Sequence, residues 1–335
     1  MIIPFFIKNR GCPHRCVFCN QQISGDRGPA DWTDESFHER VRTFLATHVS
    51  KATQAKGVQI AFYGGNFTGL AAAEQNRLLG MAHSHVENCA VEGIRISTRP
   101  DALHVPDMER LAAFGVKTVE LGAQSFIDSV LEASQRGHTA EDVEAAVELL
   151  KNNGFEVILH LMAGLPGDNC ESFGETVART IALRPDGVRI HPTLVLADTP
   201  LAEDFRQGRY EPLSLDEAVD LCTGACRRFQ KAGIPVIRMG LQTTDMMDSP
   251  GAVLGGPYHP AFGSLVAEAL WLERAVTLLD GADVRDKRLI MYVPASQESA
   301  FRGNKNRNVE LLRKQFQFAA LEIKPADQIF NYSIS

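Results

Sequence analysis

The chain has 335 residues, of which 44% are hydrophobic and 22% charged, a composition typical of soluble globular proteins. Its formal net charge of −7 excludes a general electrostatic attraction to nucleic acids or anionic membranes. No apolar run reaches the roughly 18 residues of a membrane span, and the start lacks the cleavage site of a signal peptide. Because the seven cysteines include a clustered trio rather than a disulfide framework, we expect a cytoplasmic protein.

Strand-like runs alternate with helical patterns over the first 240 residues, which favours βα units around a parallel sheet. We predict six strands of βα units, at residues 2–8, 58–63, 94–98, 117–121, 156–162 and 187–191, and a last strand at 234–239. Helices are predicted to start near Thr33, at residue 71 and at Thr139, and a further one covers 215–231. The fold class is therefore α/β, a partial (βα)6 TIM-like barrel with a small C-terminal α+β module.

The C-terminal module follows a helix predicted at 264–279. It has a strand at 288–293, a helix at 307–318 and short strands at 320–324 and 329–334. We divide the chain into a barrel domain, residues 1–245, and a C-terminal region, residues 246–335.

A basic segment runs from Arg285 to Lys314. It carries eight basic and three acidic side chains, a charge of +5, while the rest of the chain carries −12. A local basic excess on an acidic protein is a candidate phosphate-contacting patch, although charge runs are more often solvated faces.

Three cysteines, Cys12, Cys16 and Cys19, follow the first strand with the spacing C-x3-C-x2-C. Thiolates on one loop are typical ligands of an iron–sulfur cube, and three of them leave one of four irons open to a cofactor or substrate. A Cys3His zinc site that includes His14 is the alternative. The other cysteines are expected to be buried core residues, as free cysteine commonly is: Cys89, Cys170, Cys222 and Cys226.

Unusual turns follow the predicted strands, at the end where barrel enzymes gather their chemistry. Glycine lets a backbone approach a ligand closely, as Gly64 and Gly65 do here beside the amide of Asn66. The guanidinium of Arg99 matches a carboxylate. Glu120 lies on a barrel strand and needs an arginine or ligand partner, because a buried carboxylate is otherwise unfavourable.

The cysteine spacing resembles the signature of the radical S-adenosylmethionine (radical SAM) superfamily. That resemblance implies that Cys12, Cys16 and Cys19 hold a [4Fe–4S] cluster and that SAM chelates its open iron. An electron from the reduced cluster then cleaves SAM to methionine and a 5′-deoxyadenosyl radical, which abstracts a hydrogen atom from the substrate. The resemblance also implies an electron donor of the flavodoxin or ferredoxin type.

The SAM-binding residues are inferred from the same resemblance. The turn at Gly64, Gly65 and Asn66 is similar to the family's GGE motif, which meets the SAM amino group, with Asn in place of Glu. Arg99 is the candidate partner of the SAM carboxylate. The remaining candidates for the cofactor site are Phe18, Ser97, Thr98, Glu120, Gln124, Arg136, Gly164 and Leu165. His160 and His191 are interpreted as core residues.

Within the superfamily the chain is most similar to the radical SAM core of Elongator's catalytic subunit. The similarity is carried by ISTRPD (96–101), VELGAQS (119–125), HLMAGLPG (160–167) and IHPTLVLADTPLAEDFRQGRY (190–210). GHTAEDV and GLPGD resemble coproporphyrinogen-oxidase-like relatives. Elongator's subunit differs in two ways: the spacing between its first two cysteines is longer, and it has an acetyltransferase domain that this chain is too short to contain. We therefore do not expect this chain to perform the complete wobble-uridine carboxymethylation that the resemblance implies.

Three functions remain open from the sequence. The Elongator-like core and the basic segment favour a radical SAM enzyme acting on tRNA. The acidic overall charge favours a small metabolite or a tetrapyrrole as substrate instead. A non-catalytic zinc or iron–sulfur interaction module is the rival outside the enzymes.

Overall fold

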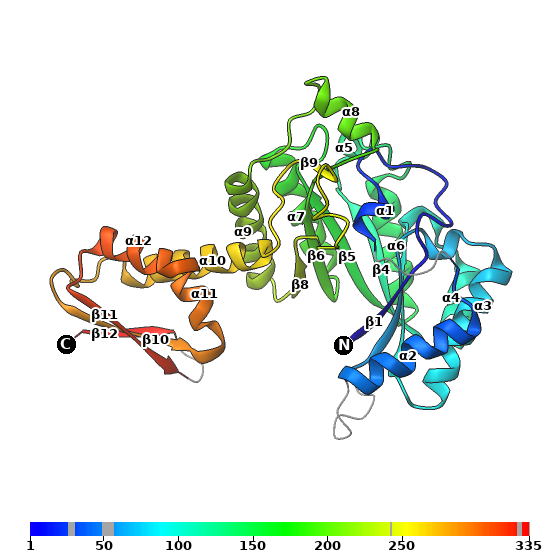
Figure 1. The fold of residues 1–335 in the computed structure, drawn as a ribbon, viewed down its shortest axis with the longest axis horizontal. Helices are drawn as coiled ribbons and strands as arrows, with labels where there is room; N and C mark the ends of the chain where they lie inside the picture. Colours follow the sequence, from blue (N-terminus) through cyan, green and yellow to red (C-terminus); the bar gives the residue numbers. More distant parts are fainter. Residues whose placement is uncertain (26–30, 49–56, 242, 327–329, 335) are drawn as a thin grey trace. The chain divides into compact units, whose positions relative to one another are not determined.

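The computed structural model describes residues 1–25, 31–48, 57–241, 243–326 and 330–334 (Figure 1). The chain divides into two compact units, one of residues 1–214 and 228–258 and one of residues 215–227 and 259–335. The boundary predicted between residues 245 and 246 falls within the first unit, and as a functional boundary it stays a prediction.

The first unit is built on a parallel sheet, which confirms the predicted α/β partial barrel. Within the described residues its strand order is β1-β2-β3-β4-β5-β6-β8. The strands are β1 Ile2–Phe6, β2 Gln59–Tyr63, β3 Gly93–Thr98, β4 Val116–Gln124, β5 Glu156–Ala163, β6 Gly187–Pro192 and β8 Val236–Met239. A separate two-stranded sheet pairs β7 Val195–Leu196 with β9 Val253–Gly255.

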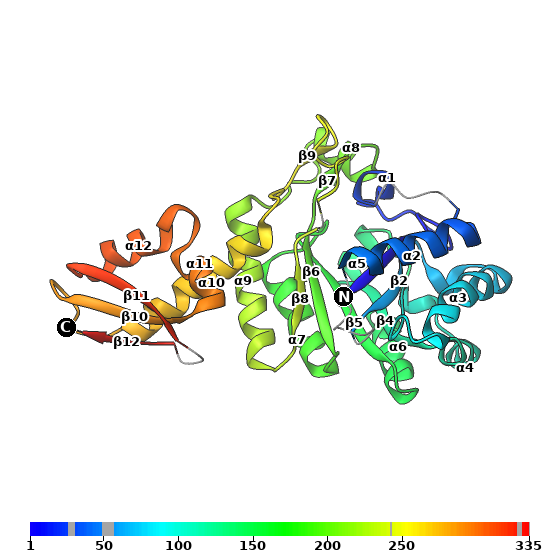
Figure 2. The same cartoon turned by 60° about the horizontal axis from the view of Figure 1, so that its bottom comes forward.

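Helices cover the outer face of the curled sheet, where α3, α4 and α6 pack against β3, β4 and β5 (Figure 2). The helices of the first unit are α1 Gln21–Ser24, α2 Asp34–His48, α3 Ala72–Glu87, α4 Val105–Ala113, α5 Asp128–Ala133, α6 Ala140–Asn152, α7 Cys170–Leu183 and α8 Pro200–Arg206. The next helix, α9 Leu215–Lys231, belongs to the second unit up to Arg227. The side chain of Thr139 accepts a hydrogen bond from the Asp142 backbone, so the predicted cap of α6 is confirmed. The sequence reasoning missed α7, although Asn169 and Ser172 form a capping box at its start.

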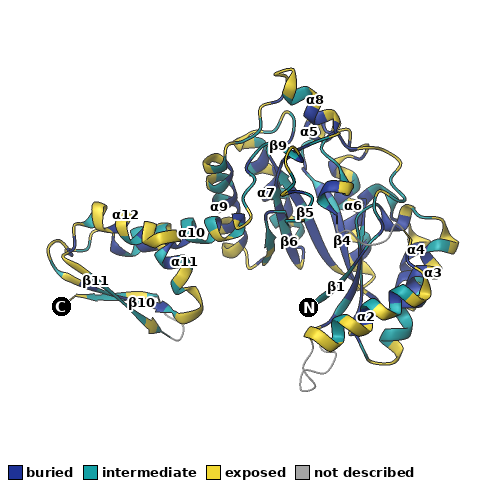
Figure 3. Cartoon of the chain, viewed as in Figure 1, coloured by how far each residue is buried: buried dark blue, intermediate teal, exposed yellow. Residues whose placement is uncertain are grey.

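The inner face of the sheet is polar, unlike the apolar outer face. Alternate residues of each strand point to opposite faces, and the outward ones, such as Ile3, Ile96 and Leu159, are fully buried under the helices (Figure 3). The inward ones include polar and charged side chains, of which Arg95 and His160 are partly exposed and Glu120 is buried. The concave face is therefore a surface for polar ligands rather than a packed core.

The isolated cysteines differ from one another. Cys222 and Cys226 on α9 are buried, as predicted. Cys89 and Cys170 are exposed, so the prediction that they are core residues is wrong. Cys89 follows the last turn of α3 and Cys170 is the first residue of α7, and helix ends of this kind lie at the surface.

The second unit joins α10 Phe262–Leu279, α11 Glu298–Arg302 and α12 Arg307–Phe316 to a sheet of order β11-β10-β12, with β10 Arg288–Pro294, β11 Ala320–Ala326 and β12 Asn331–Ile334. The apolar cluster of this unit includes Trp271, Met291, Phe301 and Leu312. The helix predicted to reach residue 318 ends at Phe316, because Gln317 takes a left-handed conformation. The first residue of the strand predicted at 329–334 lies outside the described residues. None of the helices that the structure describes is long and apolar enough to cross a membrane.

Candidate functional site

The three clustered cysteines share the wall of one cavity of about 420 Å³ at the carboxyl end of the sheet. They lie on the loop after β1, with Cys16 buried and Cys12 and Cys19 half-buried. The loop is held at Val17, whose N–H donates to Ser134 and whose carbonyl accepts from Leu201. The sequence therefore brings the thiols together on a loop that is fixed at its middle.

The thiols of the cysteine loop are the donor type that iron–sulfur clusters take. Within the described residues, no three His, Cys, Asp or Glu side chains converge closely enough for a single metal ion. Thiolates around one tetrahedral zinc lie about 3.8 Å apart, whereas those that hold an iron–sulfur cube are farther apart, on different irons. The donor set of three thiolates on one loop fits a [4Fe–4S] cluster, and metal analysis distinguishes it from the Cys3His zinc alternative that includes His14.

A glycine turn after β2 packs backbone to backbone on the cysteine loop. Gly65 has a φ of +66°, and a Cβ there would collide with the carbonyl oxygen of Arg10. Gly11, with a φ of +72°, would in the same way collide with the carbonyl of Asn66. These positions require glycine because of both the positive φ and the close approach.

Asn66 ties this turn to its neighbours instead of facing the cavity. Its side-chain amide donates to the carbonyl of Gly11 over 2.9 Å, and its Oδ1 accepts from Thr98 Oγ1 over 2.6 Å and from the Arg99 N–H over 3.2 Å. Asn66 is only 1% exposed. The structure thus gives the predicted SAM-binding amide a different set of partners.

Two guanidinium groups face the thiols. Arg99 donates to both carboxylate oxygens of Asp101, over 2.9 and 2.8 Å, and to the carbonyl of Arg136. Arg136 donates from Nη1 to Sγ of Cys16 over 3.1 Å. Burial and the neighbouring thiol of Cys16 raise the pKa of Cys19 to about 12, and the charge of Arg136 opposes this rise. The arginines therefore favour thiolates, which are the metal-binding form.

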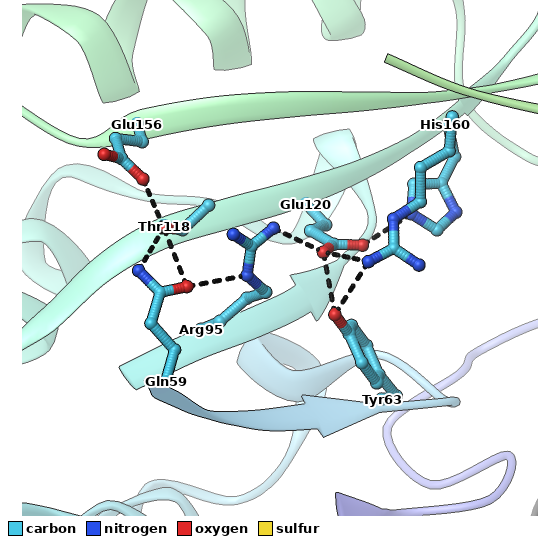
Figure 4. Close-up of polar contacts among 8 residues, drawn as sticks. Gln59, Tyr63, Arg95, Thr118, Glu120, Glu156 and His160 are labelled. Carbon is cyan, nitrogen blue, oxygen red and sulfur yellow. Dashed lines mark hydrogen bonds and ion pairs between the residues drawn. The ribbon is translucent and has the colours of Figure 1, made fainter. Parts of the chain in front are cut away.

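Glu120 forms the floor of the cavity, and Figure 4 shows its partners from neighbouring strands. Its carboxylate accepts hydrogen bonds from Arg95 (2.7 Å), Arg189 (2.9 Å), Tyr63 (2.9 Å) and His160 (2.6 Å). Burial raises the pKa of Glu120, but the hydrogen bond and charge of His160, with Arg189 and Arg95, outweigh it and lower the pKa to about 2. The expectation of an arginine partner is confirmed.

Most of the residues predicted from the sequence line this cavity. They are Cys12, Cys16, Phe18, Cys19, Gly64, Gly65, Ser97, Thr98, Arg99, Glu120, Gln124 and Arg136. Asn66, Gly164 and Leu165 do not line it. Gly164 instead accepts a hydrogen bond from Tyr210, and Leu165 is buried.

Some lining residues were not predicted. His160, interpreted as a core residue, lies in the cavity wall against Glu120. The others are Asn9, Arg15, Gln21 and Gly122, while His14 was predicted only as a ligand of the alternative zinc site. Most of these lie within a few residues of the cysteine motif, so proximity to the motif was the signal that could have identified them.

Comparisons with known proteins agree with this geometry. The family model of the radical SAM superfamily matches residues 6–180, and that of the Radical_SAM C-terminal domain matches residues 185–271. The tRNA uridine(34) acetyltransferase of Methanocaldococcus jannaschii is 36% identical over 133 residues, which are 39% of this chain and 25% of that protein. Elongator complex protein 3 of Homo sapiens is 36% identical over 133 residues, 38% of this chain and 24% of that protein.

The matched stretch thus spans about a quarter of the length of these curated relatives. By structure, the archaeal Elp3 of Methanocaldococcus infernus aligns with a TM-score of 0.62 at 21% sequence identity, over 82% of this chain and 62% of that chain. This alignment shows a shared fold.

Proposed function

The chain belongs to the radical SAM superfamily, as an enzyme of that group, and we propose that Cys12, Cys16 and Cys19 hold a [4Fe–4S] cluster at which SAM is cleaved. The observation that carries the proposal is the shared cavity of the three thiols, the two arginines and the glycine turn. When bound, the cluster supplies one electron that cleaves SAM to methionine and a 5′-deoxyadenosyl radical, which takes a hydrogen atom from the substrate to give 5′-deoxyadenosine and a substrate radical. An external one-electron donor of the flavodoxin or ferredoxin type restores the cluster.

The protein residues bind and orient. Gly64 and Gly65 line the cavity where the methionine part of SAM would lie, and Arg99 supplies a positive charge for its carboxylate. Ser97, Thr98 and Gln124 offer hydrogen bonds along the same wall. Glu120 keeps its charge at neutral pH because its native pKa is low.

A cysteine substitution tests the cluster. Anaerobically reconstituted wild-type protein should contain about four irons and acid-labile sulfide, and with dithionite it should convert SAM to 5′-deoxyadenosine. Cys16→Ala should lose both the cluster signal and the product, while the exposed Cys89→Ala should retain both. Production of 5′-deoxyadenosine by Cys16→Ala, or a colourless wild-type protein with one zinc, would contradict the proposal.

For the substrate we favour tRNA. The support is the printed name of the first relative, a tRNA uridine(34) acetyltransferase, together with the basic segment of the second unit. Three of its eight cations form ion pairs, Lys287 with Asp283, Arg288 with Glu322 and Arg302 with Glu298. Of the other five, Arg313 lies over the ring of Phe318. The remaining exposed cations have no ion-pair partner among the described residues and are free to contact phosphate: Arg285, Lys305, Arg307 and Lys314.

Retention of tRNA at varied salt tests this choice. Changing these four cations to Gln should lower the slope of log K against log salt by about 3, because each phosphate contact contributes roughly 0.7–0.9. The matched control changes exposed cations of the first unit, such as Arg206 and Arg209. Salt-independent or absent tRNA retention would favour the small metabolite or tetrapyrrole.

A further inference from the structure

Two arginines lie side by side at the β8 edge of the concave face. Arg189 of β6 and Arg238 of β8 are register partners in the parallel sheet, so their side chains project from the same face of the sheet as direct neighbours. Like charges placed directly opposite one another on neighbouring strands destabilise a sheet. Burial and the charge of Arg189 lower the pKa of Arg238, which shows that the two cations act on each other.

The carboxylate of Glu120, which lies beside these arginines, already has four hydrogen-bond partners. Glu120 accepts from Arg95, Arg189, Tyr63 and His160. Glu120 is also the carboxylate whose charge acts on Arg238. Glu120 thus pairs with Arg95 and Arg189 at once, while its charge also acts on Arg238, the register partner of Arg189.

Hydrogen-bonding atoms without a partner lie on the same face of the sheet. Nε of Arg189 and Nε2 of His191 are buried, and neither has a hydrogen-bond partner among the described residues. Buried polar atoms are nearly always hydrogen-bonded in folded proteins, so an unsatisfied pair indicates a missing partner. The ring of His191 stacks on that of His160 with centroids 5.6 Å apart, and His160 lines the cavity described above.

We propose that Arg189, Arg238 and His191 bind a carboxylate or phosphate group of the substrate, on the concave face beside the SAM cavity. An oxyanion compensates the two like charges and supplies an acceptor to Nε of Arg189 and, in the tautomer protonated at Nε2, to His191. A cationic ligand is disfavoured by the same charges, and an apolar ligand leaves the donors unsatisfied. The role of this site, to hold a substrate next to the 5′-deoxyadenosyl radical, rests on the proposed function. The binding of the anion does not depend on that function.

Calorimetric titration of the full-length, cluster-reconstituted protein tests the site. The probes are inorganic phosphate and succinate, in a buffer free of other polyanions. We expect saturable binding of at least one anion by wild type and at least tenfold weaker binding by Arg238→Gln and by His191→Phe. Arg238→Lys, which keeps the charge but loses the planar fork, should bind with intermediate affinity. Arg206→Gln, an exposed cation on α8, is the matched control and should bind like wild type.

The two probes distinguish the source of the anion. Preference for phosphate identifies a phosphorylated substrate and preference for succinate a carboxylic acid, and both support the site. Lack of saturable binding of either anion, or equal affinity in wild type and Arg238→Gln, would overturn it. Should Arg238→Gln fail to fold, the Arg238→Lys and His191→Phe titrations decide in the same way.

Thermal unfolding gives a second readout, since the anion should raise the melting temperature of wild type but not that of His191→Phe. Failure of the proposed function is recognised separately, because wild type would then make no 5′-deoxyadenosine while still binding the anion.

Discussion

Arg136 donates a hydrogen bond from Nη1 to Sγ of Cys16 over 3.1 Å, although the two residues are 120 positions apart. Its Nη2 donates to the carbonyl of Gly122, and its own carbonyl accepts from Arg99. These contacts hold a positive charge against one of the three thiols. Hydrogen bonds and charges at the sulfur atoms are the means by which a protein sets the potential of an iron–sulfur cluster.

Arg136→Met should therefore lower the reduction potential of the reconstituted cluster. Loss of the hydrogen-bond donor and of its positive charge destabilises the reduced cluster. We expect the potential to fall by roughly 60 mV, which is a tenfold change in the equilibrium constant of a one-electron couple. A redox titration followed by electron paramagnetic resonance measures it. Arg206→Met, a remote exposed cation, should leave the potential unchanged, and an unchanged or raised potential in Arg136→Met would contradict the prediction.

Glu120→Gln should strongly destabilise the protein. The substitution leaves Arg95 and Arg189 without their carboxylate, and breaking a buried ion pair costs about 3–5 kcal/mol. Urea unfolding of cluster-free protein at pH 7 measures the loss. The exposed Glu141→Gln is the control and should change the free energy of unfolding by less than about 0.5 kcal/mol.

The pH dependence of the same variants gives an independent check. The pKa of Glu120 is lowered in the folded state from 4.5 to about 2, so its stabilising contribution is present above pH 4.5 and is lost as the pH falls toward 2. The free energy of unfolding of wild type should therefore fall more steeply between pH 5 and pH 3 than that of Glu120→Gln. Parallel curves would show that folding does not lower the pKa of Glu120.

Gly65→Ala should prevent the cysteine loop from docking. Its methyl group would collide with the carbonyl oxygen of Arg10, and its φ of +66° disfavours any L side chain. Gly154→Ala is the matched control, since Gly154 has a φ of +78° but nothing within 4 Å of the added Cβ. The control should lose about 1–2 kcal/mol of stability and keep its iron. Gly65→Ala should lose more stability and most of its iron, as measured by iron content per chain.

The sequence predicts the positions of the site better than its internal contacts. Cysteine spacing and glycine turns are local patterns, so Cys12, Cys16 and Gly65 were found from their neighbours in the chain. The partners of Glu120 come from four other strands. His160 faces the cavity because of the register of β5, which no local pattern reveals.

Irregular strands were another limit. The strand predicted to end at residue 121 runs on to Gln124, past a register shift. Gln124 has a φ of +67°, a conformation uncommon outside glycine, and it lines the cavity. A bulge of this kind re-aims a side chain at the end of a strand, and its position depends on the neighbouring strands.

Asn66→Glu, which restores the residue of the similar family motif, should destabilise the chain instead of improving SAM binding. Asn66 is almost fully buried, and its amide donates to Gly11 while its Oδ1 accepts from Thr98. Glutamate lacks the donor, is one methylene longer and would place a charge against the Gly11 carbonyl, so we expect a loss of at least about 3 kcal/mol. Asn66→Asp keeps the size and the acceptor and should lose less. Urea unfolding and calorimetric SAM titration measure both effects, and a Glu variant as stable as wild type with tighter SAM binding would show that Asn66 faces the cofactor.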